Sequence, residues 1–155
     1  MTSRQSMPRQ WLIIDGSLGS ELRSVVRRLP RASGILLLEH VGRMDAGKLA
    51  ARLRRLASSR GFVIVEEEPR TAARVHNIRE LRQALSRGTG LILLSPLYPT
   101  RSHPDWKPLP RMRAAALARL GGRKLVALGG MDEQRFRRIQ HLGFSGWAGI
   151  SAFRT

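Results

Sequence analysis

The chain contains no cysteine, which excludes disulfides, cysteine–zinc sites and thiol nucleophiles together. It also lacks long apolar runs: Ile35–Leu38 and Leu91–Leu94 fall far short of the about 20 residues that a transmembrane helix needs. Near the amino end only Trp11–Ile14 is apolar, whereas a signal peptide requires a run of about 7–15 residues. We therefore expect no membrane segment, no signal peptide and a cytoplasmic location.

Aromatic and acidic residues are scarce. Aromatic residues make up 5% of the 155 residues, so the core must be built from Leu, Ile, Val and Ala. The length suits one domain, which we place over 11–155, after a flexible arm over 1–10.

Asp and Glu number 11 against 28 Lys and Arg, for a formal net charge of +17, and so basic a chain raises the question whether it binds nucleic acid. Because the arginines are spread over separate amphipathic segments and the three Trp lie far apart, no stacking platform is evident. We expect only unspecific contact with nucleic acid, through charge.

Short apolar runs alternate with helical patterns along the chain. Apolar runs predict strands at 11–14, 35–38, 62–65, 91–94, 124–128 and 147–151, with a short one around 74–76. Helical spacing predicts helices at 19–29, 45–59, 77–86, 111–120 and 132–142. Three of these helices begin at a residue that can cap the first turn: Asp45, Asn77 and Asp132. Strands that are apolar throughout and separated by helices are typical of a parallel sheet buried on both faces. The pattern predicts an α/β fold and leaves open whether the sheet is a barrel or an open sheet.

Three strand ends in the second half carry a resemblance to a known family. They are Leu-Ser-Pro-Leu-Tyr-Pro-Thr-Arg-Ser-His-Pro (94–104), Leu-Val-Ala-Leu-Gly-Gly-Met (125–131) and Gly-Trp-Ala-Gly-Ile-Ser-Ala (146–152). They resemble the last three strand ends of the thiamine phosphate synthase/TenI family, and Val75-His76-Asn77 resembles that family's fifth strand end. The family fold is a (β/α)₈ barrel, which takes about 250 residues when complete. The resemblance therefore implies a shortened TIM-barrel-like parallel barrel. The short stretch between 65 and 91 implies that the family's third helix, fourth strand and fourth helix are largely deleted.

The resemblance also implies a reaction in thiamine biosynthesis. The family joins a pyrimidine pyrophosphate to a thiazole phosphate and releases pyrophosphate with magnesium, so the expected partners are phosphorylated small molecules; a homo-oligomer is left open. The family's anion site implies roles in phosphate binding for residues at the last strand ends. These are Thr100, Ser102, Gly129, Gly130 and Ser151. The plainer interpretation is a tight turn at Gly129-Gly130 and a cap at Ser151.

The predicted metal site is incomplete. Glu67 falls on a metal-ligand position of the family, and the second metal carboxylate belongs to the deleted strand. One carboxylate holds magnesium weakly, so the sequence predicts weak synthase activity. A plainer interpretation makes Glu66–Glu68 a solvated strand end that offsets nearby arginines.

Two histidines are candidate catalytic residues. His103 stands where the family usually has Lys, and His76 lies at a strand end where the related thiazole tautomerases use a His to move a proton. His76 just before Asn77 could also simply cap a helix. The alternatives to a synthase are therefore a TenI-like tautomerase that uses His76 and a non-catalytic module that binds thiamine precursors.

Overall fold

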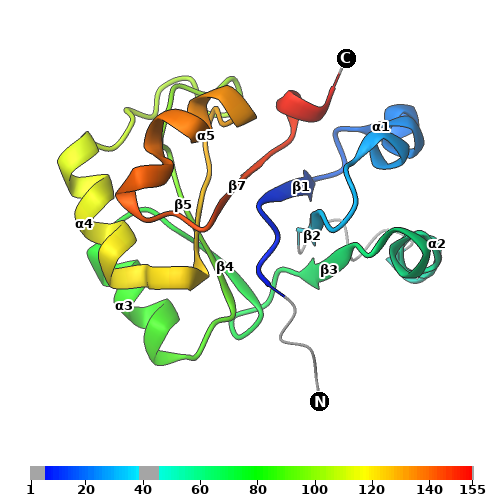
Figure 1. The fold of residues 1–155 in the computed structure, drawn as a ribbon, viewed down its shortest axis with the longest axis horizontal. Coiled ribbons are helices and arrows are strands. Elements are labelled where there is room, and N and C mark those ends of the chain that lie inside the picture. Colours follow the sequence, from blue (N-terminus) through cyan, green and yellow to red (C-terminus); the bar gives the residue numbers. More distant parts are fainter. Residues whose placement is uncertain (1–5, 39–45, 155) are drawn as a thin grey trace.

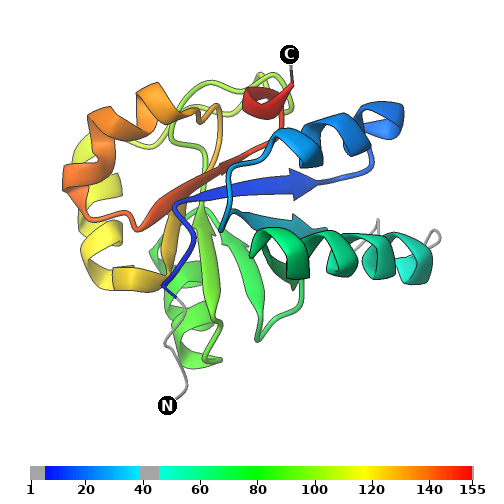
Figure 2. The same cartoon turned by 45° about the vertical axis from the view of Figure 1, so that its right-hand side comes forward.

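The computed structural model describes residues 6–38 and 46–154. Within these ranges, parallel strands form one seven-stranded sheet in the order β3-β2-β1-β7-β6-β5-β4. The strands are β1 (Gln10–Ile14), β2 (Gly34–Leu37), β3 (Val63–Glu66), β4 (Ala72–Val75), β5 (Leu91–Leu94), β6 (Leu125–Ala127) and β7 (Gly146–Gly149). β1 pairs with both β2 and β7, so the first and last strands meet; Figure 2 shows β1 running beside β7. The sheet curls into a nearly closed barrel, which confirms the predicted fold class.

Helices cover the outside of the barrel, with α1 and α2 on one side and α3, α4 and α5 on the other (Figure 1). They are α1 (Leu22–Arg28), α2 (Ala46–Arg60), α3 (Ile78–Ser86), α4 (Arg111–Gly121) and α5 (Glu133–Ile139), joined by 3₁₀ turns at Gly19–Glu21, Gly122–Lys124, Gln140–Leu142 and Ser151–Phe153. The predicted elements are all found, with ends shifted by at most two residues when the 3₁₀ turns Gly19–Glu21 and Gln140–Leu142 are counted with α1 and α5. The caps at Asn77 and Asp132 are confirmed, because their side chains accept the N–H groups of Glu80 and Arg135. The predicted cap Asp45 lies outside the described residues.

Alternate residues of each strand enter different cores. Trp11, Ile13, Leu36 and Leu93 fill the inside of the barrel. The residues between them on the strands pack outward, one set against α1 and α2 and the other against α3 to α5. Both faces of the sheet are therefore buried, as the uninterrupted apolar runs predict.

The barrel is interrupted between β3 and β4. Only residues 67–71 connect these two strands, whereas a crossover between neighbouring parallel strands takes a dozen residues or more. β3 and β4 therefore stay unpaired with each other and form the two edges of the sheet. The interruption confirms the predicted loss of one strand from the eight of a complete barrel.

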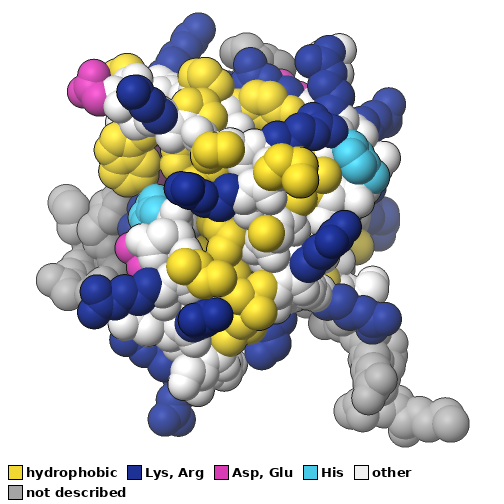
Figure 3. All heavy atoms as spheres, turned by 90° about the vertical axis from the view of Figure 1, so that its left-hand side faces the viewer, with side chains coloured by type: hydrophobic (Ala, Val, Ile, Leu, Met, Phe, Trp, Pro, Cys, Tyr) yellow, Lys and Arg dark blue, Asp and Glu magenta, His cyan; other side chains and the backbone are white. Residues whose placement is uncertain are grey.

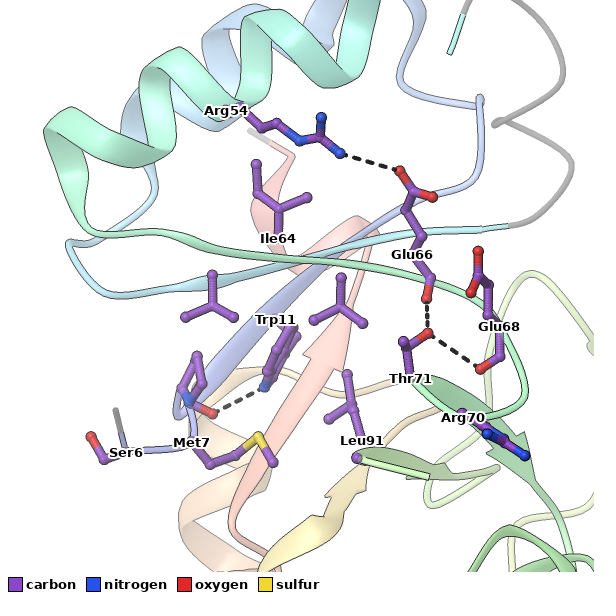
Figure 4. Close-up of a pocket in the computed structure, with 14 residues that line it drawn as sticks. Ser6, Met7, Trp11, Arg54, Ile64, Glu66, Glu68, Arg70, Thr71 and Leu91 are labelled. Carbon is purple, nitrogen blue, oxygen red and sulfur yellow. Dashed lines mark hydrogen bonds and ion pairs between the residues drawn. The ribbon is translucent and has the colours of Figure 1, made fainter. Parts of the chain in front are cut away.

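A cavity of about 680 Å³, which we call the side cavity, opens at this interruption (Figure 4). Its wall includes the apolar residues Met7, Trp11 and Leu91 together with polar and charged ones, among which Arg54 and Glu66 form a 4.0 Å ion pair. The Thr71 hydroxyl donates to the Glu66 carbonyl at 2.6 Å and ties the link to the end of β3. None of the predicted site residues lines the side cavity, so we place the candidate functional site elsewhere, although the side cavity is the larger of the two.

Candidate functional site

A second cavity, of about 470 Å³, lies at the carboxyl ends of the strands, and we call it the strand-end cavity. The residue directly after each of the seven described strands lines it. These residues are Asp15, Leu38, Glu67, His76, Ser95, Leu128 and Ile150. Its volume falls within the about 300–1,000 Å³ of small-molecule sites. Ligands of (β/α) barrels bind at this same end of the strands.

Most of the predicted site residues meet in this cavity. Those that line it are Glu67, His76, Thr100, Ser102, His103 and Gly129. Gly130 and Ser151 do not line it. The Gly130 carbonyl accepts a hydrogen bond from Arg135, and Ser151 is exposed at the start of the last 3₁₀ turn. The structure thus brings six of the predicted residues together, and their roles stay predictions.

The anion-binding part of the prediction rests on the loop between β5 and α4. Thr100 and Ser102 present their hydroxyls there, and the Ser102 N–H donates to Thr100 Oγ1 at 3.3 Å. Gly129 allows this loop to approach the end of β6, because a Cβ at Gly129 would lie 2.7 Å from Pro96 Cα. At the start of α5, one backbone N–H already has a partner, since Asp132 accepts the Arg135 N–H at 2.7 Å. The hydroxyls are therefore the better supported anion donors.

His76 is held by the Glu80 carboxylate, in the first turn of α3. Glu80 accepts the His76 backbone N–H at 2.7 Å and lies 3.0 Å from His76 Nδ1. In a capping box this carboxylate would accept the backbone N–H of the capping residue, Asn77. Here it accepts the backbone N–H of the preceding residue, His76, and so also lies beside the imidazole ring. Burial alone would raise the pKa of Glu80, but the hydrogen bonds from His76 and Asn77 outweigh it and hold that pKa below its ordinary value. An ionised carboxylate only accepts hydrogen bonds, so Nδ1 is the donor in this contact and Nε2 is the ring nitrogen that does not face Glu80.

Trp106 is one of the site residues that the sequence did not reveal. Its ring stacks on His103 with a centroid distance of 4.0 Å and an angle of 10°, and meets His76 edge-on at 5.1 Å and 88°. All three rings belong to residues that line the strand-end cavity. The sequence shows only one Trp in a proline-rich loop. The conformation of that loop is what brings the Trp106 ring into contact with the two histidines.

Glu67 has a partner that changes its predicted role. Arg74 donates to both oxygens of its carboxylate, from Nε at 2.7 Å and from Nη2 at 3.4 Å. The Glu67 side chain is 16% exposed, and both residues line the strand-end cavity. Residues 6–38 and 46–154 contain no group of three or more His, Cys, Asp or Glu side chains that could hold a metal ion. A carboxylate already neutralised by a guanidinium is a poor magnesium ligand, so these residues do not fit the predicted metal site.

The fold and the site together define a (β/α)-barrel protein with polar residues gathered at the carboxyl ends of its strands. A family model described as thiamine monophosphate synthase matches residues 63–153, more than half of the chain. The chain belongs to the thiamine monophosphate synthase/TenI family.

Solved structures with the same fold carry related names. A thiamine phosphate pyrophosphorylase from Pyrococcus furiosus aligns with a TM-score of 0.79 at 17% identity, over 97% of this chain and 89% of that one. A thiamine phosphate pyrophosphorylase from Bacteroides thetaiotaomicron aligns with a TM-score of 0.57 at 15% identity, over 94% and 84%. Identities this low show the fold alone. Among the curated proteins no match was found. Family and fold support a role in thiamine biosynthesis.

The surface adds little about other partners. On the face shown in Figure 3, Lys and Arg are interspersed with apolar side chains and form no single stripe. Across the described ranges, no helix combines the length and the apolar character needed to cross a membrane.

Proposed function

We propose that the chain binds a thiazole phosphate in the strand-end cavity and joins it to a pyrimidine pyrophosphate, with release of pyrophosphate. One observation carries the proposal: six residues taken from the family-like strand ends line one cavity of suitable volume. The family and the fold support the pathway.

The chain's own groups suit the breaking of a bond to pyrophosphate. Negative charge grows on the leaving group while the pyrimidine becomes cationic, and fixed donors stabilise that charge. The Arg74 guanidinium lines the cavity and serves as a donor for the pyrophosphate, while the Thr100 and Ser102 hydroxyls hold the phosphate of the thiazole. His103 lies in the loop between β5 and α4 and lines the same cavity. Because the described residues do not form a magnesium site, we expect slow turnover compared with an enzyme that has one.

The Glu80–His76 pair favours a second candidate function. A carboxylate on Nδ1 fixes the tautomer of the ring and presents Nε2 as a base. That arrangement suits the transfer of a proton on a bound thiazole, as in a TenI-like tautomerase. The third possibility, a binding module without turnover, shares the same cavity and differs only in kinetics.

The proposal is tested by calorimetric binding of thiazole phosphate together with an assay for thiamine phosphate formation from both precursors. We expect measurable binding, slow formation of thiamine phosphate and a large loss of both in the Thr100→Val/Ser102→Ala double variant. The matched control is Ser24→Ala/Ser58→Ala, on α1 and α2 outside the cavity, which should behave as the wild type. Absence of thiazole phosphate binding by the wild type would overturn the proposal.

The same protein preparations separate the two activities. His76→Asn should abolish tautomerisation of the thiazole precursor if the second candidate is correct, while His141→Asn, outside the cavity, should leave it unchanged. Binding without either activity in the wild type would identify a non-catalytic module.

A further inference from the structure

Trp106 differs from the other two tryptophans. Trp11 and Trp147 are 1% and 2% exposed, and their indole N–H groups donate to the Pro8 carbonyl and to Glu133. Trp106 is 43% exposed at the strand-end cavity. A large aromatic surface held open beside a cavity is not needed for the core, so its placement calls for another explanation.

The ring that covers Trp106 shows what its surface accepts. The His103 imidazole, a flat five-membered heteroaromatic ring, lies nearly parallel to the indole at 4.0 Å. Such stacked pairs are favourable beyond the area that they bury. Residues 101–108 are all exposed, so His103 can leave the indole without uncovering a core. Its neighbour His76 is instead anchored through both its backbone and its ring by Glu80.

The loop that carries Trp106 also carries the proposed anion donors. Thr100 and Ser102 precede it by a few residues, and both line the same cavity. The loop is fastened where the Leu109 N–H donates to the Pro96 carbonyl at 2.9 Å. One fastened loop therefore offers hydroxyls for a phosphate and an aromatic surface for a ring.

We propose that Trp106 is the specificity-determining residue for the heteroaromatic ring of the substrate. The thiazole ring of the ligand takes the place of the His103 imidazole on the indole, while its phosphate reaches Thr100 and Ser102. This inference rests on the proposed function, because it assigns the ring-binding part of the same cavity. It separates ring recognition, by Trp106, from anion recognition, by the hydroxyls.

The test compares a ligand that has a ring with one that lacks it. Thiazole phosphate and inorganic pyrophosphate are titrated by calorimetry into the wild type, Trp106→Phe and Trp106→Leu. Trp106→Leu should weaken thiazole phosphate about tenfold, which is the scale of one aromatic stack. Trp106→Phe, which keeps a ring, should stay within about threefold of the wild type, and pyrophosphate should bind all three proteins equally. Met112→Ala, an exposed apolar residue on α4 and outside the cavity, is the control and should change neither affinity.

Intrinsic fluorescence gives a second readout, because Trp106 is the exposed tryptophan among the three. Thiazole phosphate should change the emission of the wild type, and pyrophosphate should leave it nearly unchanged.

The outcomes distinguish this inference from the function on which it rests. Equal thiazole phosphate affinity in the wild type and Trp106→Leu would overturn the role of Trp106 and leave the proposed function standing. A parallel loss of pyrophosphate affinity would also overturn it, by showing a general disturbance of the cavity. No binding of thiazole phosphate by the wild type would overturn both.

Discussion

The Glu67–Arg74 ion pair joins the end of β3 to β4 across the interruption in the barrel, and its removal is the sharpest test of what Glu67 does. Glu67→Gln and Arg74→Gln each remove one charge and keep most of the side-chain volume. If the pair holds the two edges of the barrel together, each single variant destabilises the fold, and the double variant costs little more than either one.

The size of the effect follows from the exposure and geometry of the pair. Exposed ion pairs contribute about 0.2–1 kcal/mol, and hydrogen bonds to charged groups about 1.5–3 kcal/mol. The side chains of Glu67 and Arg74 are 16% and 42% exposed, and two hydrogen bonds join them. We therefore expect a coupling free energy of about 1 kcal/mol, between the two classes. For a chain of this length that corresponds to a fall in Tm of about 2–4 °C in each single variant.

Urea unfolding of the wild type, both single variants and the double variant gives the coupling free energy directly. Strictly additive effects, with no coupling, would refute the structural role of the pair. A magnesium titration of Tm decides the alternative: a metal that binds Glu67 stabilises the wild type and not Glu67→Gln. We expect magnesium to shift both proteins equally.

Three further predictions concern the core, the pH dependence of stability and the surface. Gly34→Ala would push a Cβ into the Trp11 ring and should lower the free energy of unfolding in urea by about 1–3 kcal/mol. The control Gly90→Ala, whose Cβ meets only the Thr71 carbonyl at 3.5 Å, should stay within about 0.5 kcal/mol of the wild type, and equal losses would contradict the packing argument. Hydrogen bonds from Arg9, then Trp147 and Arg137, outweigh burial and hold the pKa of Glu133 below its ordinary 4.5, so its contribution is present above that pH and is lost as the pH falls through the lowered value. The difference in urea midpoint between the wild type and Glu133→Gln should shrink from about pH 7 to about pH 3, and a constant difference would show that the charge is immaterial. Binding to duplex DNA should fall by orders of magnitude between about 50 and 200 mM salt; sequence-selective binding that persists would contradict a purely electrostatic contact.

The sequence predicted the fold well because each strand of a parallel barrel is buried on both faces and therefore leaves an uninterrupted apolar run. Leu91–Leu94 is the clearest example, since its predicted and observed ends coincide. The missing strand was predictable for a different reason, as residues 66–90 are too few for the two strands and three helices that a complete barrel would have there. The residues that directly follow strands were also predictable, because parallel strands end at the same side of the barrel.

The partners of the site residues could not be predicted, since they depend on loop conformation and strand register. Arg74 is paired in the sheet with Leu93, whose side chain points into the barrel. A charged residue at an inward-facing strand position was the one feature of the sequence that pointed to a cation in the cavity. Glu80 stands four residues after His76, a spacing that lets side chains meet on one helical turn, but its role at the helix start was the more obvious one. Trp106 stacks on His103 only because the proline-rich loop folds back over the strand ends.

The most direct measurement of the central claim is a crystal structure of the protein with thiazole phosphate and pyrophosphate. The account predicts both ligands in the strand-end cavity, with phosphate oxygens within hydrogen-bond distance of Thr100 and Ser102 and the thiazole ring against Trp106. Ligand density in the side cavity between β3 and β4, or none at the strand ends at saturating ligand concentration, would contradict it.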